Sequence, residues 1–194
     1  MKTKKGEIKV KKEGIEIEGE DFEFFIPLGT TGLLKFWDIL EEKKNSFRIG
    51  KVREGKKYLL ETFVPENGVV VVVGKIFEGE EVKKKLSFHL RQGKYVLIAE
   101  VKEALKDALK EGWEIKRFVF PLYYSLSDRG LYMIWKEEEA YIPKKFLIVL
   151  REALKSDGNF QVGKVKVESG KLFIGNREVD KEHKREIERL LELI

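Results

Sequence analysis

Apolar and polar residues alternate along the first part of the chain, which is the period of a β-strand with one buried face. A Glu-Gly pair at residues 13–14 separates two such runs, whose apolar members are Ile8, Val10, Ile15 and Ile17. Residues 22–26 form a third run, and Pro27 ends it. The chain then changes to helical spacing, with one apolar face made of Leu33, Phe36, Trp37 and Leu40. The pattern predicts three strands followed by a helix.

The order of strands followed by a helix recurs along the rest of the chain. Further strands are expected at residues 47–54, 57–64, 69–77, 82–90, 113–124, 131–136, 160–167 and 171–174. Amphipathic helices are expected at residues 97–108, 146–154 and 183–194. Short separators between the strands favour antiparallel pairing. We therefore predict an α+β fold of repeated antiparallel β-sheet units, each followed by an α-helix, with curved sheets backed by the helices.

The predicted elements divide the chain into four units. A first strand-helix unit covers residues 1–45, and a four-strand-plus-helix unit covers residues 46–112. A third strand-helix unit covers residues 113–158, and a short C-terminal one covers residues 159–194. Because no Pro-rich or Ser-rich linker separates the units, one compact domain and two lobes are both compatible with the sequence.

Two of the expected strands begin with related sequences, which indicates a diverged internal repeat. Phe-Arg-Ile-Gly-Lys-Val at residues 47–52 is echoed by Phe-Gln-Val-Gly-Lys-Val at residues 160–165. In both copies the apolar alternation shifts by one residue at the glycine, Gly50 or Gly163. A shift of phase at a glycine is what a β-bulge produces, so a bulge is expected at both positions.

The expected bulges would turn basic side chains outward in both copies. These side chains are Lys51, Arg53, Lys164 and Lys166. One interpretation is a basic stripe on a curved sheet that binds an anion. The alternative is that lysines keep an edge strand soluble. The sequence favours neither interpretation over the other.

Composition limits the classes of protein that the chain can belong to. Charged residues make up 38% of the chain and cysteine is absent. The Lys-rich and Glu-rich composition is typical of heat-adapted proteins, and the absence of cysteine favours a reducing compartment. The N-terminal residues lack the apolar stretch of a signal peptide, and no apolar run is long enough to cross a membrane. We expect a cytoplasmic protein without a membrane partner, whose net charge of +5 is too small to define a ligand.

Three segments resemble proteins that bind single-stranded nucleic acid. Residues 25–40, from Phe-Ile-Pro-Leu-Gly to Trp-Asp-Ile-Leu, are similar to the strand-to-helix segment of Pur-alpha repeats. Residues 117–120 and 129–134 resemble the first hairpin of such a repeat, and residues 83–90 resemble the end of the positive cofactor four domain. The resemblance to this group, which includes the Whirly proteins, implies a curved four-stranded sheet backed by a helix. It also implies binding of single-stranded nucleic acid and pairing of repeats or subunits.

Single strands are bound by cations that contact phosphates and by aromatic rings on which bases stack. Residues 43–57 contain seven Lys and Arg residues against one Glu, a local charge of 7 − 1 = +6. A second cluster combines Lys116, Arg117 and Arg129 with aromatic residues. The expected phosphate ligands are Arg48, Lys51, Arg53, Lys57, Arg117 and Arg129. The expected stacking residues come from Tyr58, Tyr124, Tyr132 and Trp135.

The aromatic residues of the second cluster must divide between core and surface. Phe118 and Phe120, two residues apart, are expected in the core. Tyr124 and Trp135 lie near turns, so they are expected to be partly exposed.

The sequence favours binding over catalysis. The chain has only two histidines, His89 and His183, and neither has metal-ligand spacing. The glycines at residues 68 and 74 do not match a phosphate-binding loop, because five residues separate them and Ile76 replaces the Ser or Thr that would bind magnesium. We expect no cofactor and no metal. The alternative among enzymes is a metal-dependent nuclease, which would need clustered carboxylates on adjacent strands.

We therefore expect a non-catalytic protein that binds single-stranded DNA or RNA with low sequence specificity. The alternative is an assembly protein that pairs with copies of itself or with another subunit. Two apolar segments motivate this alternative: the valines at residues 69–73, and the C-terminal stripe of Ile187, Leu190, Leu191 and Ile194. Either segment could instead belong to an ordinary core.

Overall fold

The computed structural model describes residues 4–21, 23–42, 52–53, 56–63, 71–78 and 81–194. For residues 4, 24 and 42, and for those residues between 52 and 89 that the structure describes, the description covers the backbone alone. The chain forms two compact units, Met1–Ala104 and Leu105–Ile194, and the boundary falls within one helix. The α+β class predicted from the sequence is confirmed, since antiparallel sheets recur and each is followed by a helix.

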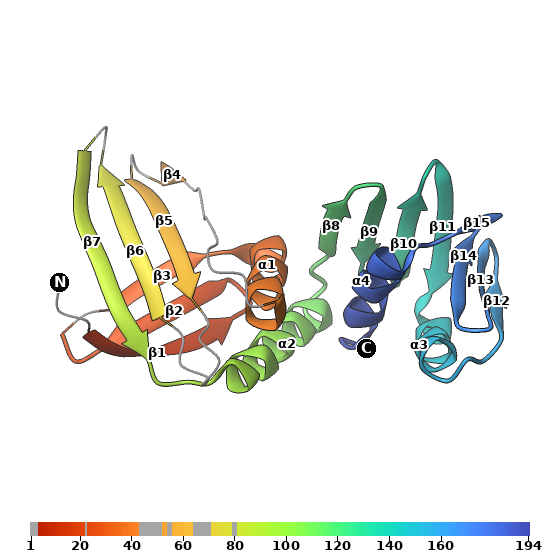
Figure 1. Ribbon diagram of the computed structural model, residues 1–194, viewed down its shortest axis with the longest axis horizontal. Helices are drawn as coiled ribbons and strands as arrows, with labels where there is room; N and C mark the ends of the chain where they lie inside the picture. The colour runs from red at the N-terminus through yellow and green to blue at the C-terminus, as the bar shows by residue number, and fades with distance from the viewer. Residues whose placement is uncertain (1–3, 22, 43–51, 54–55, 64–70, 79–80) are drawn as a thin grey trace. The chain divides into compact units, whose positions relative to one another are not determined.

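The first unit is built on a seven-stranded sheet with the strand order β3-β2-β1-β7-β6-β5-β4 (Figure 1). Its first three strands are β1 (Lys4–Lys11), β2 (Gly14–Gly19) and β3 (Glu23–Pro27), and helix α1 (Gly29–Glu42) follows them. The next four are β4 (Val52–Arg53), β5 (Lys56–Phe63), β6 (Val71–Glu78) and β7 (Glu81–Leu90), followed by α2 (Lys94–Lys110). All neighbouring strands are antiparallel except β1 and β7, which are parallel.

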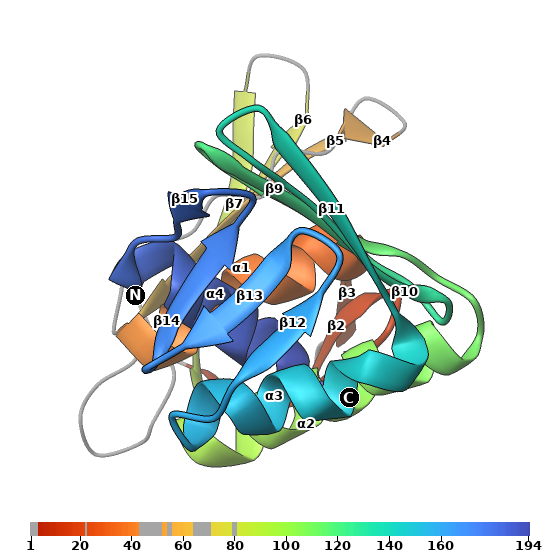
Figure 2. The same ribbon diagram turned by 90° about the vertical axis from the view of Figure 1, so that its right-hand side faces the viewer.

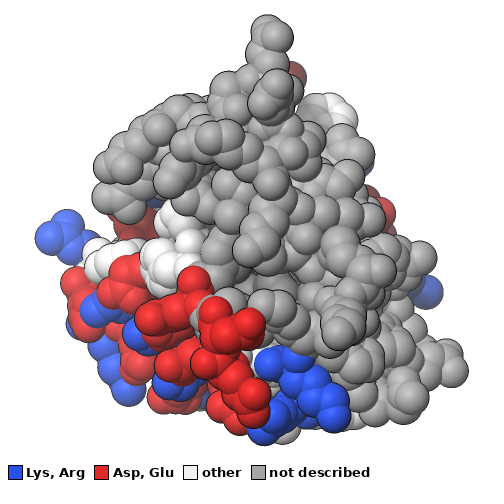
Figure 3. All heavy atoms as spheres, turned by 90° about the vertical axis from the view of Figure 1, so that its left-hand side faces the viewer, with Lys and Arg blue, Asp and Glu red and all other residues white. Residues whose placement is uncertain are grey.

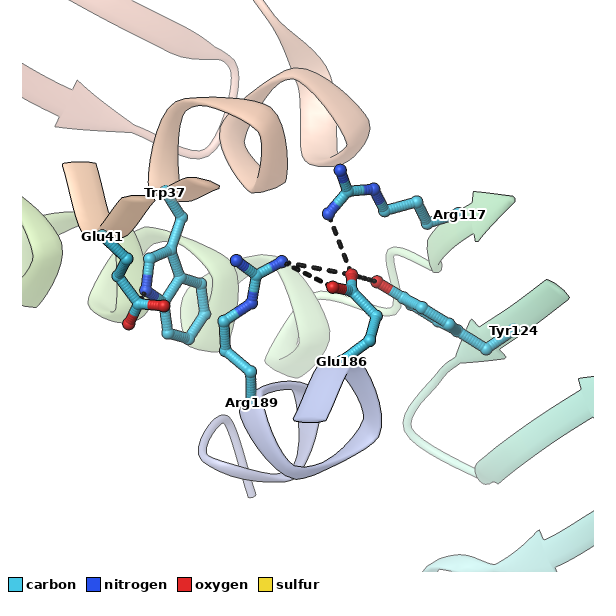
Figure 4. Close-up of polar contacts among 6 residues, drawn as sticks. All are labelled: Trp37, Glu41, Arg117, Tyr124, Glu186 and Arg189. Atoms are coloured by element: carbon cyan, nitrogen blue, oxygen red, sulfur yellow. Dashed lines mark hydrogen bonds and ion pairs between the residues drawn. The ribbon is translucent and has the colours of Figure 1, made fainter. Parts of the chain in front are cut away.

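The core of the first unit lies between the strands β1–β3 and the apolar faces of α1 and α2. Alternate residues of the strands are buried, as the period of two requires: Ile8, Ile15, Ile17 and Ile26. Trp37 of α1 is fully buried, and its Nε1–H donates to Glu41 Oε1 over 2.7 Å (Figure 4). Lys102 of α2 lies 5.4 Å from the centre of the Trp37 ring.

The second unit contains two four-stranded antiparallel sheets (Figure 1). The first sheet consists of β8 (Ile115–Val119), β9 (Leu122–Leu126), β10 (Gly130–Trp135) and β11 (Glu138–Pro143). A 3-10 turn, η1 (Lys144–Phe146), leads into α3 (Leu147–Lys155). The second sheet consists of β12 (Phe160–Val162), β13 (Val165–Glu168), β14 (Lys171–Ile174) and β15 (Arg177–Glu178), followed by α4 (Lys181–Leu191). Helix α3 lies beside β12 and β13, as Figures 1 and 2 show.

Helix α4 covers the inner face of the β8–β11 sheet. Asp180 caps the helix, because its Oδ1 accepts the backbone N–H of His183 over 2.9 Å. Three members of the C-terminal apolar stripe, Ile187, Leu190 and Leu191, are buried, so they are not available to a second subunit. The predicted division of the chain at residues 45, 112 and 158 stays a prediction.

The expected bulge at Gly163 is wrong. Gly163 and Lys164 form the two-residue turn of a hairpin, because Val162 pairs directly with Val165. Gly163 has φ 56°, a left-handed conformation that favours glycine. The turn, rather than a bulge, accounts for the shift of the apolar alternation. Lys164 and Lys166 do not form a basic stripe, because each pairs with a carboxylate, Glu138 at 3.3 Å and Glu168 at 2.7 Å. The first copy of the repeat, at residues 47–51, lies outside the described residues.

The positions of two turns in the first sheet of the second unit are seen only in the structure. Residues 113–124 contain two strands, β8 and β9, joined at Phe120-Pro121. Glu138 and Glu139 belong to β11, and the turn that precedes this strand falls on Lys136 and Glu137. Across the part of the chain that the structure describes, every helix is too short or too polar to span a membrane.

Candidate functional site

The β8–β11 sheet has one covered face and one face that carries aromatic side chains toward solvent. The covered face is fully apolar at its centre, where Leu122, Leu131 and Met133 are completely buried. On the other face, strand pairing places side chains in two rows across the sheet. The first row is Lys116, Ser125, Tyr132 and Tyr141. The second row is Phe118, Tyr123, Ile134 and Glu139. We call these eight residues the open face.

The aromatic rings of the open face contact one another. Tyr123 and Tyr132 meet edge to face with ring centres 6.3 Å apart and an interplanar angle of 69°. Phe118 meets Phe120 of the adjoining turn at 6.1 Å and 72°. Edge-to-face contact is a preferred geometry for pairs of aromatic rings. Phe118 is 65% exposed and Phe120 is 80% exposed.

The second sheet of the same unit shows that this surface is not a general property of the fold. The outward row across β12–β15 is Gln161, Lys166, Phe173 and Glu178. Three of these four side chains are polar, and Lys166 pairs with Glu168. A solvated sheet face normally carries polar side chains of this kind. The open face of β8–β11 departs from that rule because four of its eight side chains are aromatic.

Charge is distributed unevenly around the open face. The end of the sheet beside the first row carries exposed cations, which we call the basic border: Lys116, Arg129, Lys144 and Lys145. Backbone contacts connect this border to the sheet, because the Arg129 carbonyl accepts the Tyr141 hydroxyl at 3.0 Å and the Lys144 N–H at 2.9 Å. With Glu114, which pairs with Lys116 at 3.0 Å, and Asp128, the end has a formal charge of 4 − 2 = +2.

The opposite end of the same sheet is acidic. The turn between β10 and β11 contributes Lys136 and Glu137, and β11 contributes Glu138 and Glu139. Burial, and then the charge and hydrogen bond of Glu139, raise the pKa of Tyr132 above its ordinary value. An anionic ligand would therefore be attracted to the basic border and repelled from this acidic end.

A polar cluster lies beneath the sheet and holds it against α4 (Figure 4). Glu186 Oε1 accepts from Arg117 Nη1 at 2.9 Å and from the Tyr124 hydroxyl at 2.8 Å. Arg189 contacts both oxygens of the same carboxylate, at 3.1 and 3.2 Å. Burial, and then the charge of Glu186, raise the pKa of Tyr124 far above its ordinary value, so this phenol stays protonated. The cluster is structural, because the carboxylate faces the covered side of the sheet.

The structure corrects three of the predicted site residues. Tyr124 and Trp135 are 0% exposed, so neither offers a ring face to a base. Arg117 points to the covered side and pairs with Glu186, which makes it unsuitable as a phosphate ligand. Phe118 and Phe120 are exposed, so the expectation that they belong to the core is wrong.

The other predicted residues divide into two groups. Tyr132 lies on the open face and Arg129 on the basic border, so the structure brings these two together. Arg53 lies in β4, and Lys57 and Tyr58 lie in β5, where the description covers the backbone alone. Arg48 and Lys51 lie outside the described residues.

Sequence reasoning missed several members of the open face: Phe118, Tyr123 and Tyr141. One signal could have indicated Tyr123. Leu122 and Leu126 flank β9 at its two ends and share the phase of Tyr124, so Tyr123 must face the other way. The same reasoning applied to Leu131 and Met133 places Tyr132 outward.

The first unit presents a different surface on β1–β3. Residues 5–23 contain seven carboxylates and four lysines, and they include the exposed residues Glu7, Glu18 and Glu20. Figure 3 shows Asp and Glu side chains gathered over this region. Lys9 pairs with Glu18 at 3.1 Å and Lys11 with Glu16 at 2.7 Å. Paired lysines within an acidic surface are unsuited to holding phosphates.

Two further observations concern the class of protein. Comparisons with protein-family models, curated proteins and solved structures found no significant match to this chain. Within the described residues, His, Asp and Glu side chains form no group of three or more that could hold a metal ion.

Proposed function

We propose that this protein binds single-stranded nucleic acid on the open face of the β8–β11 sheet, without catalysing a reaction. The observation that carries the proposal is the concentration of Phe118, Tyr123, Tyr132 and Tyr141 on one outward sheet face. Bases stack on such rings whatever their identity, so sequence specificity is expected to be low. The sequence resemblance to the Pur-alpha, positive cofactor four and Whirly group implies the same class of ligand.

The charge distribution supports a defined placement of the strand. Phosphates would lie along the basic border, near Arg129, Lys144 and Lys145, and bases would lie over the aromatic rings. The acidic end of the sheet, with Glu138 and Glu139, disfavours the reverse arrangement.

The strength of binding can be bounded from the number of rings. Each stacked base contributes about 1–3 kcal/mol, so two or three stacked bases contribute about 2–9 kcal/mol. A dissociation constant of 1 μM corresponds to about 8 kcal/mol, so stacking at one copy of the site should give binding of about 0.3 μM at the strongest and far weaker at the lower end of the range. With two or three phosphates at the border, log Kd should change by about 1.4–2.1 per log unit of salt.

The test is a fluorescence-anisotropy titration of a labelled single-stranded oligonucleotide. Tyr132→Thr and Tyr141→Thr should each weaken binding about fivefold or more, because each removes one stacking ring. The matched control is Phe173→Thr, which removes an aromatic side chain from the outward row of the other sheet and should leave binding unchanged. Lys144→Ala should mainly reduce the slope of log Kd against log salt concentration, by about 0.7 for the one phosphate contact that is lost.

The competing proposal is self-association through the same open face, since exposed aromatic surface also mediates contacts between subunits. The valine segment gives less support to assembly than its sequence suggested, because β6 pairs with both β5 and β7 and presents no strand edge. Mass measurement of wild type and Tyr141→Thr across a range of concentrations separates the two proposals. If wild type forms a dimer that Tyr141→Thr disrupts, and if no oligonucleotide binds, the open face is a dimer interface. Its ligand is then a second copy of this chain and not a nucleic acid.

A further inference from the structure

His183, in the first turn of α4, joins that helix to the turn at one end of the open face. The side chain is 8% exposed. Its Nδ1 lies 2.7 Å from Asp180 Oδ1, and its Nε2 lies 3.0 Å from the Phe120 carbonyl oxygen. A carboxylate and a carbonyl only accept hydrogen bonds. The imidazole therefore makes both bonds only when both ring nitrogens carry a proton, that is, in its cationic form.

Groups from three elements surround this ring. Asp180 and Glu182 face it from the start of α4, and the Phe120 carbonyl faces it from the β8–β9 turn. On the third side, the Trp135 ring of β10 lies 5.1 Å away, and Lys136 Nζ lies 5.0 Å from the centre of the same Trp135 ring. Burial lowers the pKa of His183, but the hydrogen bonds to Asp180 and Phe120 and the nearby carboxylate charges outweigh burial and raise it above its ordinary value.

The Phe120 carbonyl belongs to the same turn that carries the exposed edge of the open face. The Phe120 side chain contacts Phe118 edge to face, and Phe118 occupies the second row beside Tyr123. A hydrogen bond at the Phe120 carbonyl therefore restrains the backbone from which this aromatic pair projects. Restraint before binding lowers the entropy cost of ordering these side chains around a ligand.

We propose that the protonation state of His183 regulates the open face, by fixing or releasing the Phe120 turn. The inference rests on the proposed function for the identity of the ligand, a single-stranded nucleic acid. It adds a pH-dependent control that lies on the covered side of the sheet, away from the ligand itself.

The direction of the effect follows from the two hydrogen bonds. Below the pKa of His183 the imidazolium makes both bonds and the turn is fixed. As the pH rises through that pKa, one proton leaves. The bond to the charged Asp180 is the stronger of the two, so the remaining proton stays on Nδ1. The Nε2 lone pair then faces the Phe120 carbonyl oxygen, the contact becomes repulsive, and the turn is released.

The experiment measures oligonucleotide affinity from pH 6 to pH 8.5 at constant ionic strength. Wild type should bind about twofold to tenfold more weakly at the upper pH, the range expected for the loss of one hydrogen bond. His183→Gln should bind with the same affinity at both pH values, because the amide does not titrate. The matched control is His89→Gln, which removes the only other histidine and should keep the wild-type pH dependence.

NMR of the ligand-free protein gives a second readout. The Phe120 carbonyl and the ring signals of Phe118 and Phe120 should shift with the same midpoint as the His183 imidazole. If they do not, or if the affinity of His183→Gln varies with pH as the wild type does, the regulation is overturned while nucleic-acid binding stands. If no oligonucleotide binds at any pH, the proposed function fails, and with it the control of affinity. The ligand-free titration does not depend on His183→Gln folding.

Discussion

Replacing Glu186 with alanine tests whether the polar cluster beneath the β8–β11 sheet holds α4 in place. The substitution removes the carboxylate that accepts from Arg117 at 2.9 Å and from Tyr124 at 2.8 Å, and that also contacts Arg189. Breaking a buried ion pair by removing one partner costs about 3–5 kcal/mol. The side chains of Glu186 and Arg117 are each 15% exposed, so the lower end of that range applies.

Loss of the Tyr124 hydrogen bond adds to this cost. A hydrogen bond to a charged group contributes about 1.5–3 kcal/mol, but contributions within one cluster are not additive. We therefore expect Glu186→Ala to lower the free energy of unfolding of the second unit by about 3–4 kcal/mol. Glu186→Gln should cost about half as much, because its amide oxygen still accepts from Tyr124 while the charge is lost.

The assay is urea unfolding followed by circular dichroism and tryptophan fluorescence. With a slope of about 1–3 kcal/mol per molar urea, the midpoint should fall by about 1–4 M. The matched control is Glu188→Ala on the same helix, which removes a half-exposed pair with Lys184 at 3.5 Å and should cost only about 0.3–0.5 kcal/mol. Equal, small shifts for Glu186→Ala and Glu188→Ala would refute the stabilising role of the cluster.

The remaining predictions concern a turn and a helix cap of the second unit. Glu137 has φ 73° in the β10–β11 turn, a left-handed conformation that favours glycine. Glu137→Gly should therefore raise the free energy of unfolding by about 1 kcal/mol, whereas Glu138→Gly, within β11, should lower it. Thermal unfolding of the two variants compares these effects. Asp180→Ala should cost about 1 kcal/mol through loss of the helix cap, and no change in the melting temperature would contradict that role. Because the folded state raises the pKa of His183, the stability that its charge contributes is complete below the ordinary histidine pKa, and it is lost as the pH rises through the raised value. Urea unfolding from pH 5 to pH 9 should show this loss in wild type and not in His183→Gln.

The class of fold could be predicted because it depends on local patterns. The apolar period of residues 183–194 predicts a helix with a buried stripe, and α4 buries Ile187, Leu190 and Leu191 in this way. The alternation in residues 8–17 likewise predicts the β1–β2 hairpin, whose register pairs Ile8 with Ile17. In both segments the apolar residues repeat with only one spacing, so only one face of the helix or strand can be the buried one.

The orientation of β8 could not be predicted, because its sequence is apolar in both phases. Ile115 and Val119 define one face, and Phe118 defines the other together with Phe120 of the turn. In the structure Arg117 points inward, on the same face as Ile115. The covered face accommodates the charge of Arg117 only because Glu186 of α4, 69 residues later in the chain, pairs with it. This long-range partner cannot be read from a local pattern, and it reverses which aromatic residues are available to a ligand.

The position of turns was a second source of error. A phase shift at Gly163 is compatible with a bulge or with a two-residue hairpin, and only the pairing of Val162 with Val165 distinguishes them. Adjacent glutamates such as Glu138 and Glu139 are more typical of a turn than of a strand. They are tolerated in β11 because Glu138 pairs with Lys164 and Glu139 faces outward.

The central claim is that the open face of the β8–β11 sheet contacts the bases of a single strand. The most direct measurement is an NMR titration of the isotope-labelled protein with a short unlabelled oligonucleotide. We predict that the signals of Phe118, Tyr123, Tyr132 and Tyr141 change together, while that of Phe173 on the other sheet does not. Changes centred on Phe173, or unchanged signals for all four open-face rings at saturating oligonucleotide, would contradict the claim.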